Sequence, residues 1–225
     1  MKYTSIKVLL SFILIAGLSF SALAGKKKVL VSCSEPDAAI YSNGIKVGTG
    51  QAEIIVLSNA CVTINIERSG FLEVEETICN KKGFPKPSKT KYYEMLPDPA
   101  YDASIQTDIA NTDIEVELNP NRDNIESWKI LNQVVTNYFD VIEISDRETG
   151  YLRTAWNMQT FPNAAVRTRI IIKIGSLEPL SYKVKLVSEI GESGTSVKSD
   201  HKFAEWDRVL RTYETVVDQI TSRLK

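Results

Sequence analysis

Short stretches of alternating apolar and polar residues fill the first half of the chain, and turn-forming residues separate them. Alternation with a period of two is typical of strands that bury one face. Asn43 and Gly44 lie between two such stretches and favour a hairpin, because a type I′ turn needs positive φ at both central positions. The pattern predicts an all-β region with strands at residues 28–31, 38–42, 45–47, 51–57, 61–67, 71–78 and 92–96.

The second half of the chain mixes two periods. Residues 113–118 alternate as a strand, and residues 125–139 place apolar side chains at helical spacing directly after Asn124, a residue type that caps helices. A second helical stripe runs through residues 203–224 and predicts a long C-terminal helix. The strands expected between the helices span residues 141–145, 151–159, 165–174 and 182–189. We therefore expect an α+β region in which both helices pack on one face of an antiparallel sheet.

Three short motifs surround the predicted hairpin: Ser34-Glu35-Pro36, Tyr41-Ser42-Asn43-Gly44 and Val47-Gly48. In this order they resemble the PEGA family, and the resemblance covers residues 27–97. PEGA domains are small extracytoplasmic β-domains, so the resemblance implies a β-sandwich used for binding or spacing at the bacterial envelope rather than for catalysis.

Residues 105–225 are similar in layout to a helix-grip domain, and in particular to the C-terminal domains of the C-component lipoprotein of the outer-membrane β-barrel assembly machinery. Pro97-Asp98-Pro99 stands before this region, and proline both ends strand ladders and extends the residue before it. The predicted organisation is a PEGA-like β-domain at 25–97, a Pro-rich linker at 98–104 and the helix-grip-like domain at 105–225.

The first 24 residues have the pattern of a secretory signal peptide: lysines, an apolar run over 8–20 and a small-residue end. We expect cleavage between Ala24 and Gly25, which would place the mature protein in the periplasm or at the extracellular face of the envelope. Leu30-Val31-Ser32-Cys33 also matches a lipobox, so a lipid anchor at Cys33 is the competing prediction. No later stretch is apolar for about 18 residues, and the mature chain is therefore expected to lack a transmembrane span.

The chain has three cysteines, and cysteines of exported proteins often form disulfides, so their pairing has to be considered. The strands at 61–67 and 71–78 place their apolar faces together only when paired residue numbers have an even sum. Such a register brings Cys61 near Cys79, and we predict a disulfide there. Cys33 is then a buried thiol or the lipid anchor, while the alternative is that all three cysteines stay reduced. No ligand spacing for a metal accompanies them.

Charge and motif content exclude several classes of function. The predicted signal peptide contains two lysines and no acidic residue, so the mature chain has 27 − 2 = 25 basic and 28 acidic residues, a net charge of −3. An acidic chain argues against a nucleic-acid partner. His201 is the single histidine, and no P-loop, nucleophile elbow or His-Glu-x-x-His motif is present. We therefore predict a non-enzyme without a cofactor or a metal.

Basic residues gather on the predicted strands of the C-terminal domain: Arg153, Arg167, Arg169, Lys173, Lys183 and Lys185. Alternation places most of them opposite the apolar face, on an exposed patch. One interpretation is a solvated face whose charges prevent sheets from associating. The other is a binding patch for an acidic envelope protein or an anionic glycan, since arginine forms paired hydrogen bonds with carboxylates.

The tryptophans Trp128, Trp156 and Trp206 all lie on predicted apolar faces. A pocket lined by these rings between helix and sheet would be the natural ligand site of a helix-grip domain. The leading hypothesis is an exported, non-catalytic envelope protein that combines a spacer or adhesion module with a protein-interaction domain. The alternative is a periplasmic binding protein that holds a small apolar or glycan ligand in the C-terminal domain.

Overall fold

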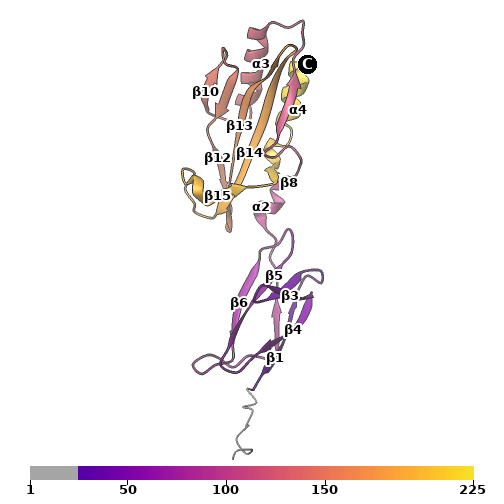
Figure 1. Ribbon diagram of the computed structural model, residues 1–225, viewed down its shortest axis with the longest axis vertical. Coiled ribbons are helices and arrows are strands. Elements are labelled where there is room, and N and C mark those ends of the chain that lie inside the picture. The colour runs from indigo at the N-terminus through magenta and orange to yellow at the C-terminus, as the bar shows by residue number, and fades with distance from the viewer. Residues whose placement is uncertain (1–24) are drawn as a thin grey trace, which may run out of the picture. The chain divides into compact units, whose positions relative to one another are not determined.

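The computed structural model describes residues 25–225, so the predicted signal peptide and the start of its cleavage site lie outside the described residues. The described chain is mostly β, with few helices, as the sequence predicts. Its contacts divide it into two compact units (Figure 1). The first unit comprises residues 25–68 and Glu73–Met95, and the second comprises Ser69–Leu72 and Leu96–Lys225.

The first unit is built from short strands: β1 (Lys27–Cys33), β2 (Ala39–Ser42), β3 (Ile45–Thr49), β4 (Gln51–Val56), β5 (Cys61–Glu67), β6 (Val74–Cys79) and β7 (Thr90–Tyr93). They pair in the order β6-β5-β2-β3-β4-β1-β7, antiparallel except for β1 and β7. The predicted sandwich of two sheets is therefore one continuously hydrogen-bonded sheet. Only Thr49 and Gln51 pair β3 with β4, so the sheet turns sharply there.

Gly50 makes this corner possible. Its φ is +66°, and a Cβ at this position would lie 2.4 Å from the carbonyl oxygen of Pro36. Glycine alone tolerates both conditions, because it has no Cβ and populates positive φ readily. The Val47-Gly48 exit of the hairpin therefore leads into a backbone corner that only glycine can occupy.

Alternate residues of the central strands bury the apolar side chains of the first unit. Ile54 on β4 and Ile64 on β5 are each 1% exposed. Cys61 lies directly opposite Cys79 in the β5–β6 ladder, and their sulfur atoms form a disulfide. The register argument from the sequence is thus confirmed. Cys33 is a free thiol whose Sγ donates to the carbonyl oxygen of Glu35 at 3.1 Å.

The second unit is organised around one long hairpin of β13 (Ala164–Leu177) and β14 (Leu180–Glu192). β11 (Tyr151–Thr154) and β12 (Asn157–Thr160) pair with β13, and β10 (Ile142–Asp146) extends the sheet beyond β11. β9 (Asp113–Glu117) and β15 (Phe203–Glu205) pair with β14. The remaining elements are α2 (Pro99–Asp102), β8 (Ser104–Gln106), α3 (Asn124–Thr136), β16 (Arg208–Leu210), the 3-10 turns Asp200–Lys202 and Arg211–Tyr213, and α4 (Val216–Leu224).

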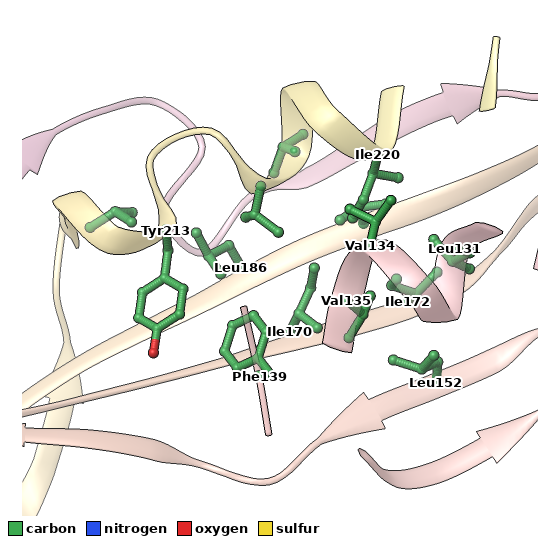
Figure 2. Close-up of a cluster of buried hydrophobic side chains, with 14 of the residues drawn as sticks. Leu131, Val134, Val135, Phe139, Leu152, Ile170, Ile172, Leu186, Tyr213 and Ile220 are labelled. Atoms are coloured by element: carbon green, nitrogen blue, oxygen red, sulfur yellow. The ribbon is translucent and has the colours of Figure 1, made fainter. Parts of the chain in front are cut away.

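Helices α3 and α4 cover one face of this sheet, and their apolar residues form one core with it (Figures 1 and 2). Phe139 stacks on Tyr213 with 4.8 Å between ring centroids. The labelled side chains that meet there come from both helices and the strands: Leu131, Val134, Val135, Leu152, Ile170, Ile172, Leu186 and Ile220. We call the covered side the inner face of the sheet and the other side the outer face.

The C-terminal helix is shorter than the sequence predicts. Residues 203–213 form β15, β16 and a 3-10 turn, and only Val216–Leu224 is α-helical. Arg208 explains the difference, because it is 8% exposed and its Nε donates to Ser104 Oγ at 2.8 Å across the β16–β8 pair. Tertiary pairing with β8 thus replaces the local helical preference.

Other boundaries shift by smaller amounts. The predicted linker at 98–104 belongs to the second unit as α2 and the start of β8, since the Asp98 side chain accepts from the Ala100 amide at 2.9 Å and caps α2. Helix α3 begins at Asn124, so Asp123 takes the capping position instead. The predicted strand 151–159 is broken between β11 and β12.

Candidate anion-binding site

The six basic residues predicted as a patch divide into two groups on the sheet of the second unit. On β13 Val166, Ile170 and Ile172 are fully buried on the inner face, and the alternate positions project to the outer face. One group is made of arginines: Arg153, Arg167 and Arg169. The other is made of lysines: Lys173, Lys183 and Lys185.

The lysines surround an acidic residue of their own chain. Lys173 Nζ lies 2.9 Å from one carboxylate oxygen of Asp113 on β9, and Lys185 Nζ lies 3.7 Å from the other. The hydrogen bond from Lys173 is the main cause that lowers the pKa of Asp113, and the charges of Lys185, Lys173 and Lys183 add to it. Lys173 is about 13 Å along β13 from Arg169, at about 3.3 Å per residue. The lysines are therefore a separate group, in which Lys173 and Lys185 share the carboxylate of Asp113.

Arg167 differs most from the prediction. The alternation predicts an exposed side chain, and this is wrong, because the residue is only 2% exposed. Its Nε donates to Glu189 Oε2 at 2.7 Å, and its Nη1 donates to Asp200 Oδ1 at 2.8 Å and to the carbonyl oxygen of Val197 at 2.5 Å. Two of these acceptors belong to residues 193–202, the segment between β14 and β15. Arg167 therefore fastens this segment to the outer face.

Aromatic rings complete the burial of Arg167. Its guanidinium carbon lies 4.2 Å from the ring centroid of Trp156 and 4.1 Å from that of Phe203. Arg169 lies 4.0 Å from the same Trp156 ring. The alternation predicts that Trp156 shares the inner face with Leu152, but the break between β11 and β12 moves it to the arginines of the outer face. Guanidinium groups and rings thus form one stack.

Of the three arginines in this group, Arg169 is the one whose hydrogen-bond donors have no partner among residues 25–225. Arg153 is paired, because its Nη2 lies 3.1 Å from Glu143 Oε2. Arg169 makes no hydrogen bond or ion pair with any residue from 25 to 225, and its Nε is buried without a partner. Burial is the main cause that lowers the pKa of Arg169, and the positive charges of Arg153 and Arg167 lower it further. A buried donor without a partner costs about 1–3 kcal/mol, which sets Arg169 apart from the fully paired Arg167.

A cleft of about 480 Å³ opens beside Arg169 on the outer face. Lys198 stands at its rim, exposed and without an ion pair among residues 25–225. The residues that line the cleft are Glu143, Arg153, Ala155, Trp156, Arg169, Val197, Lys198 and Asp200. Because Glu143 and Asp200 are engaged by Arg153 and Arg167, two cations of the cleft have no ion-pair partner among residues 25–225, Arg169 and Lys198.

The sequence does not predict the part that residues 193–202 take in this site. The glycine and serine content around Gly191–Ser199 is typical of an exposed loop, and no local signal shows that it crosses the sheet. His201 lies in the same segment and is exposed. Lys198 is therefore a site residue that only the tertiary structure reveals.

The predicted pocket between helix and sheet is occupied by the protein's own side chains. Trp128 is 8% exposed and lies 5.8 Å from the ring of Tyr182, and Trp206 packs partly buried against the same core. These two rings take part in core packing. Among the three tryptophans, Trp156 alone lines the cleft of the outer face.

No protein-family model matches the chain, and no curated protein matches its sequence at a significant level. The PEGA and helix-grip resemblances therefore stay predictions. Within residues 25–225, no cluster of three or more His, Cys, Asp or Glu side chains could hold a metal ion. None of the helices in that range has the length and apolar character needed to cross a bilayer.

Proposed function

We propose that the chain is an exported, non-catalytic envelope protein whose second unit binds a carboxylate of an acidic partner protein in the cleft beside Arg169. The first unit serves as a PEGA-like spacer or adhesion module. The helix-grip-like second unit is the interaction domain, and it acts in the periplasm or at the extracellular face of the envelope.

One observation carries the proposal: Arg169 lines an open cleft but makes no hydrogen bond or ion pair with residues 25–225, and its Nε is buried without a partner. Structural arginines normally satisfy their donors, as Arg167 does with Glu189 and Asp200 on the same strand face. An external carboxylate would accept from Arg169 in the bidentate geometry that suits a guanidinium. Lys198 at the rim adds a second positive charge within reach of the same anion.

The chemistry of the cleft favours a protein carboxylate over an anionic glycan. Sugar rings bind most often by stacking on an aromatic face, but the Trp156 ring is already contacted by Arg167 at 4.2 Å and Arg169 at 4.0 Å. Alternate residues of a strand are about 7 Å apart, a spacing that fits one ring between two guanidinium groups. Trp156 therefore orients the arginines and leaves little ring surface for a sugar.

The same cleft could hold a small anionic ligand, which keeps a periplasmic binding protein as the second candidate. Its volume of about 480 Å³ lies within the range of small-molecule sites. A small apolar ligand is not favoured, because Trp128 and Trp206 fill the helix–sheet core.

Site-specific photocrosslinking in cells tests the proposal. A photoreactive residue is introduced at Ser196, which is exposed and directly precedes the cleft-lining residues Val197 and Lys198. We expect it to capture the same envelope proteins repeatedly, and we expect Arg169→Met to abolish the capture. Arg147→Met is the matched control, since it removes an equal charge from an exposed turn of the same unit. Capture that is unaffected by Arg169→Met, or lost equally with Arg147→Met, contradicts the proposal.

A further inference from the structure

The loop between β6 and β7 in the first unit is strongly basic. Residues 80–89 contain four lysines and no acidic residue, and Lys91 follows at the start of β7. Phe84 stands among them and is 50% exposed, with Lys81 Nζ 4.6 Å from its ring centroid. An aromatic ring held half in solvent among lysines has no evident role in the core of the first unit.

Two other segments meet this loop at the same end of the first unit. Asn80 Nδ2 donates to the carbonyl oxygen of Gly25 at 3.1 Å, which joins the loop to the start of β1. The amide of Asn59 donates to the carbonyl oxygen of Asn80 at 2.8 Å, which joins the loop to the β4–β5 turn. Leu57 precedes that turn and is 55% exposed. The charges of Lys26 and Lys27 therefore add to those of the loop.

Six lysines at this end are exposed and form no ion pair with the described residues: Lys26, Lys27, Lys81, Lys82, Lys86 and Lys89. The two other lysines of these segments are neutralised, Lys28 by Glu53 at 2.8 Å and Lys91 by Glu76. We call the six lysines together with Leu57 and Phe84 the lysine end. It carries about six positive charges in a chain whose formal net charge is −1.

We propose that the lysine end docks the protein on a membrane surface that contains anionic lipid. All six unpaired cations are lysines, whose point charges suit a diffuse layer of headgroups, whereas a defined carboxylate or phosphate site favours the planar fork of arginine. Lysine clusters are attracted to anionic bilayers, and exposed aromatic and aliphatic side chains enter the interface beside them. Phe84 and Leu57 supply that apolar component.

Vesicle co-sedimentation with the purified mature chain, residues 25–225, tests the charge component. We expect binding to vesicles of equal phosphatidylglycerol and phosphatidylcholine at low salt, and much weaker binding to phosphatidylcholine alone. Each lysine near such a surface raises partitioning roughly fivefold, so Lys81→Gln, Lys82→Gln and Lys86→Gln together should lower it about a hundredfold.

The matched control replaces three exposed lysines that lie elsewhere, Lys46, Lys129 and Lys225, by glutamine. The net charge change is the same, and we expect partitioning to stay within threefold of wild type. Equal binding to both kinds of vesicle, or an equal loss in the control, overturns the proposal. So does binding to a soluble hexaglutamate peptide that requires the loop lysines while anionic vesicles are ignored, because that outcome assigns the surface to an acidic protein.

Phe84→Trp tests the apolar component separately. The difference in emission between this variant and wild type isolates the new indole from the three native ones. We expect it to shift to the blue on anionic vesicles and to stay unchanged with phosphatidylcholine. Binding without a shift would contradict insertion of residue 84 into the interface.

Discussion

Arg167 and Arg169 occupy equivalent positions on β13, two residues apart on one face, yet the structure assigns them opposite energetic roles. Arg167 is 2% exposed and paired with Glu189 and Asp200, whereas Arg169 has a buried Nε without a partner. Replacing each by methionine keeps most of the aliphatic volume and removes the charge. We predict that Arg167→Met destabilises the second unit strongly and that Arg169→Met does not.

The magnitude for Arg167→Met follows from its partners. The Glu189 side chain is 19% exposed, so loss of its charged hydrogen bonds costs about 2 kcal/mol. The Asp200 side chain is 82% exposed, and solvent screening limits that pair to less than about 1 kcal/mol. The contacts with Trp156 and Phe203 add about 0.5–1 kcal/mol each. The sum is about 3–5 kcal/mol, which matches the cost of breaking a buried pair from one side.

For Arg169→Met the contributions nearly cancel. The variant loses one stacking contact with Trp156, worth about 0.5–1 kcal/mol, and it relieves an unsatisfied buried donor and the repulsion from Arg153 and Arg167. We expect the free energy of unfolding to change by less than about 1 kcal/mol. A residue that is dispensable for stability and yet charged and half-buried is typical of a binding site.

Urea denaturation followed by tryptophan fluorescence measures both values. All three tryptophans lie in the second unit, so the signal reports that unit. Hydrogen exchange of residues 193–202 provides a second measurement, in which Arg167→Met should lose protection and Arg169→Met should retain it. If Arg169→Met costs as much as Arg167→Met, the assignment of one arginine to structure and the other to binding is refuted.

Three further predictions concern both units. The disulfide has a sequence separation of 18, so replacing Cys61 and Cys79 by alanine should lower the stability of the first unit by about 3 kcal/mol in thermal unfolding. Gly50→Ala forces a Cβ to 2.4 Å from the oxygen of Pro36 at a φ of +66°, and we expect a loss of more than about 2 kcal/mol in the same assay. Burial raises the pKa of Tyr213 to about 12. Because the folded state holds this proton more tightly, its contribution is full below about pH 10 and is lost as the pH rises toward 12, and Tyr213→Phe should reduce that loss.

Local rules predict the parts of the structure that depend on neighbours in sequence. The Asn43-Gly44 turn has positive φ at both residues, as a type I′ hairpin requires. The parity of the β5–β6 register brought Cys61 near Cys79 but left it opposite either Thr77 or Cys79, and the structure shows the second register. Alternation on β13 correctly separates the buried Ile170 from the charged positions.

Long-range packing decides the parts that local rules miss. Apolar residues of 203–213 fit a helical stripe, yet β16 pairs with β8 about a hundred residues earlier, and nothing near Arg208 in sequence indicates this. Alternation places Arg167 on the outer face but cannot show that residues 193–202 cover it. The sequence therefore placed Arg153, Arg167 and Arg169 on strands of one sheet, while Lys198 and the division into paired and available cations required the tertiary structure.

The most direct test of the account is a calorimetric titration of the purified full chain with a hexaglutamate peptide, compared between wild type, Arg169→Met and Arg147→Met. The account predicts salt-dependent binding to wild type, at least tenfold weaker binding to Arg169→Met because a charged hydrogen-bond pair is lost, and unchanged binding to Arg147→Met. Equal affinities for the three proteins, or no binding to wild type at low salt, would contradict the claim that Arg169 binds the carboxylates of an acidic partner.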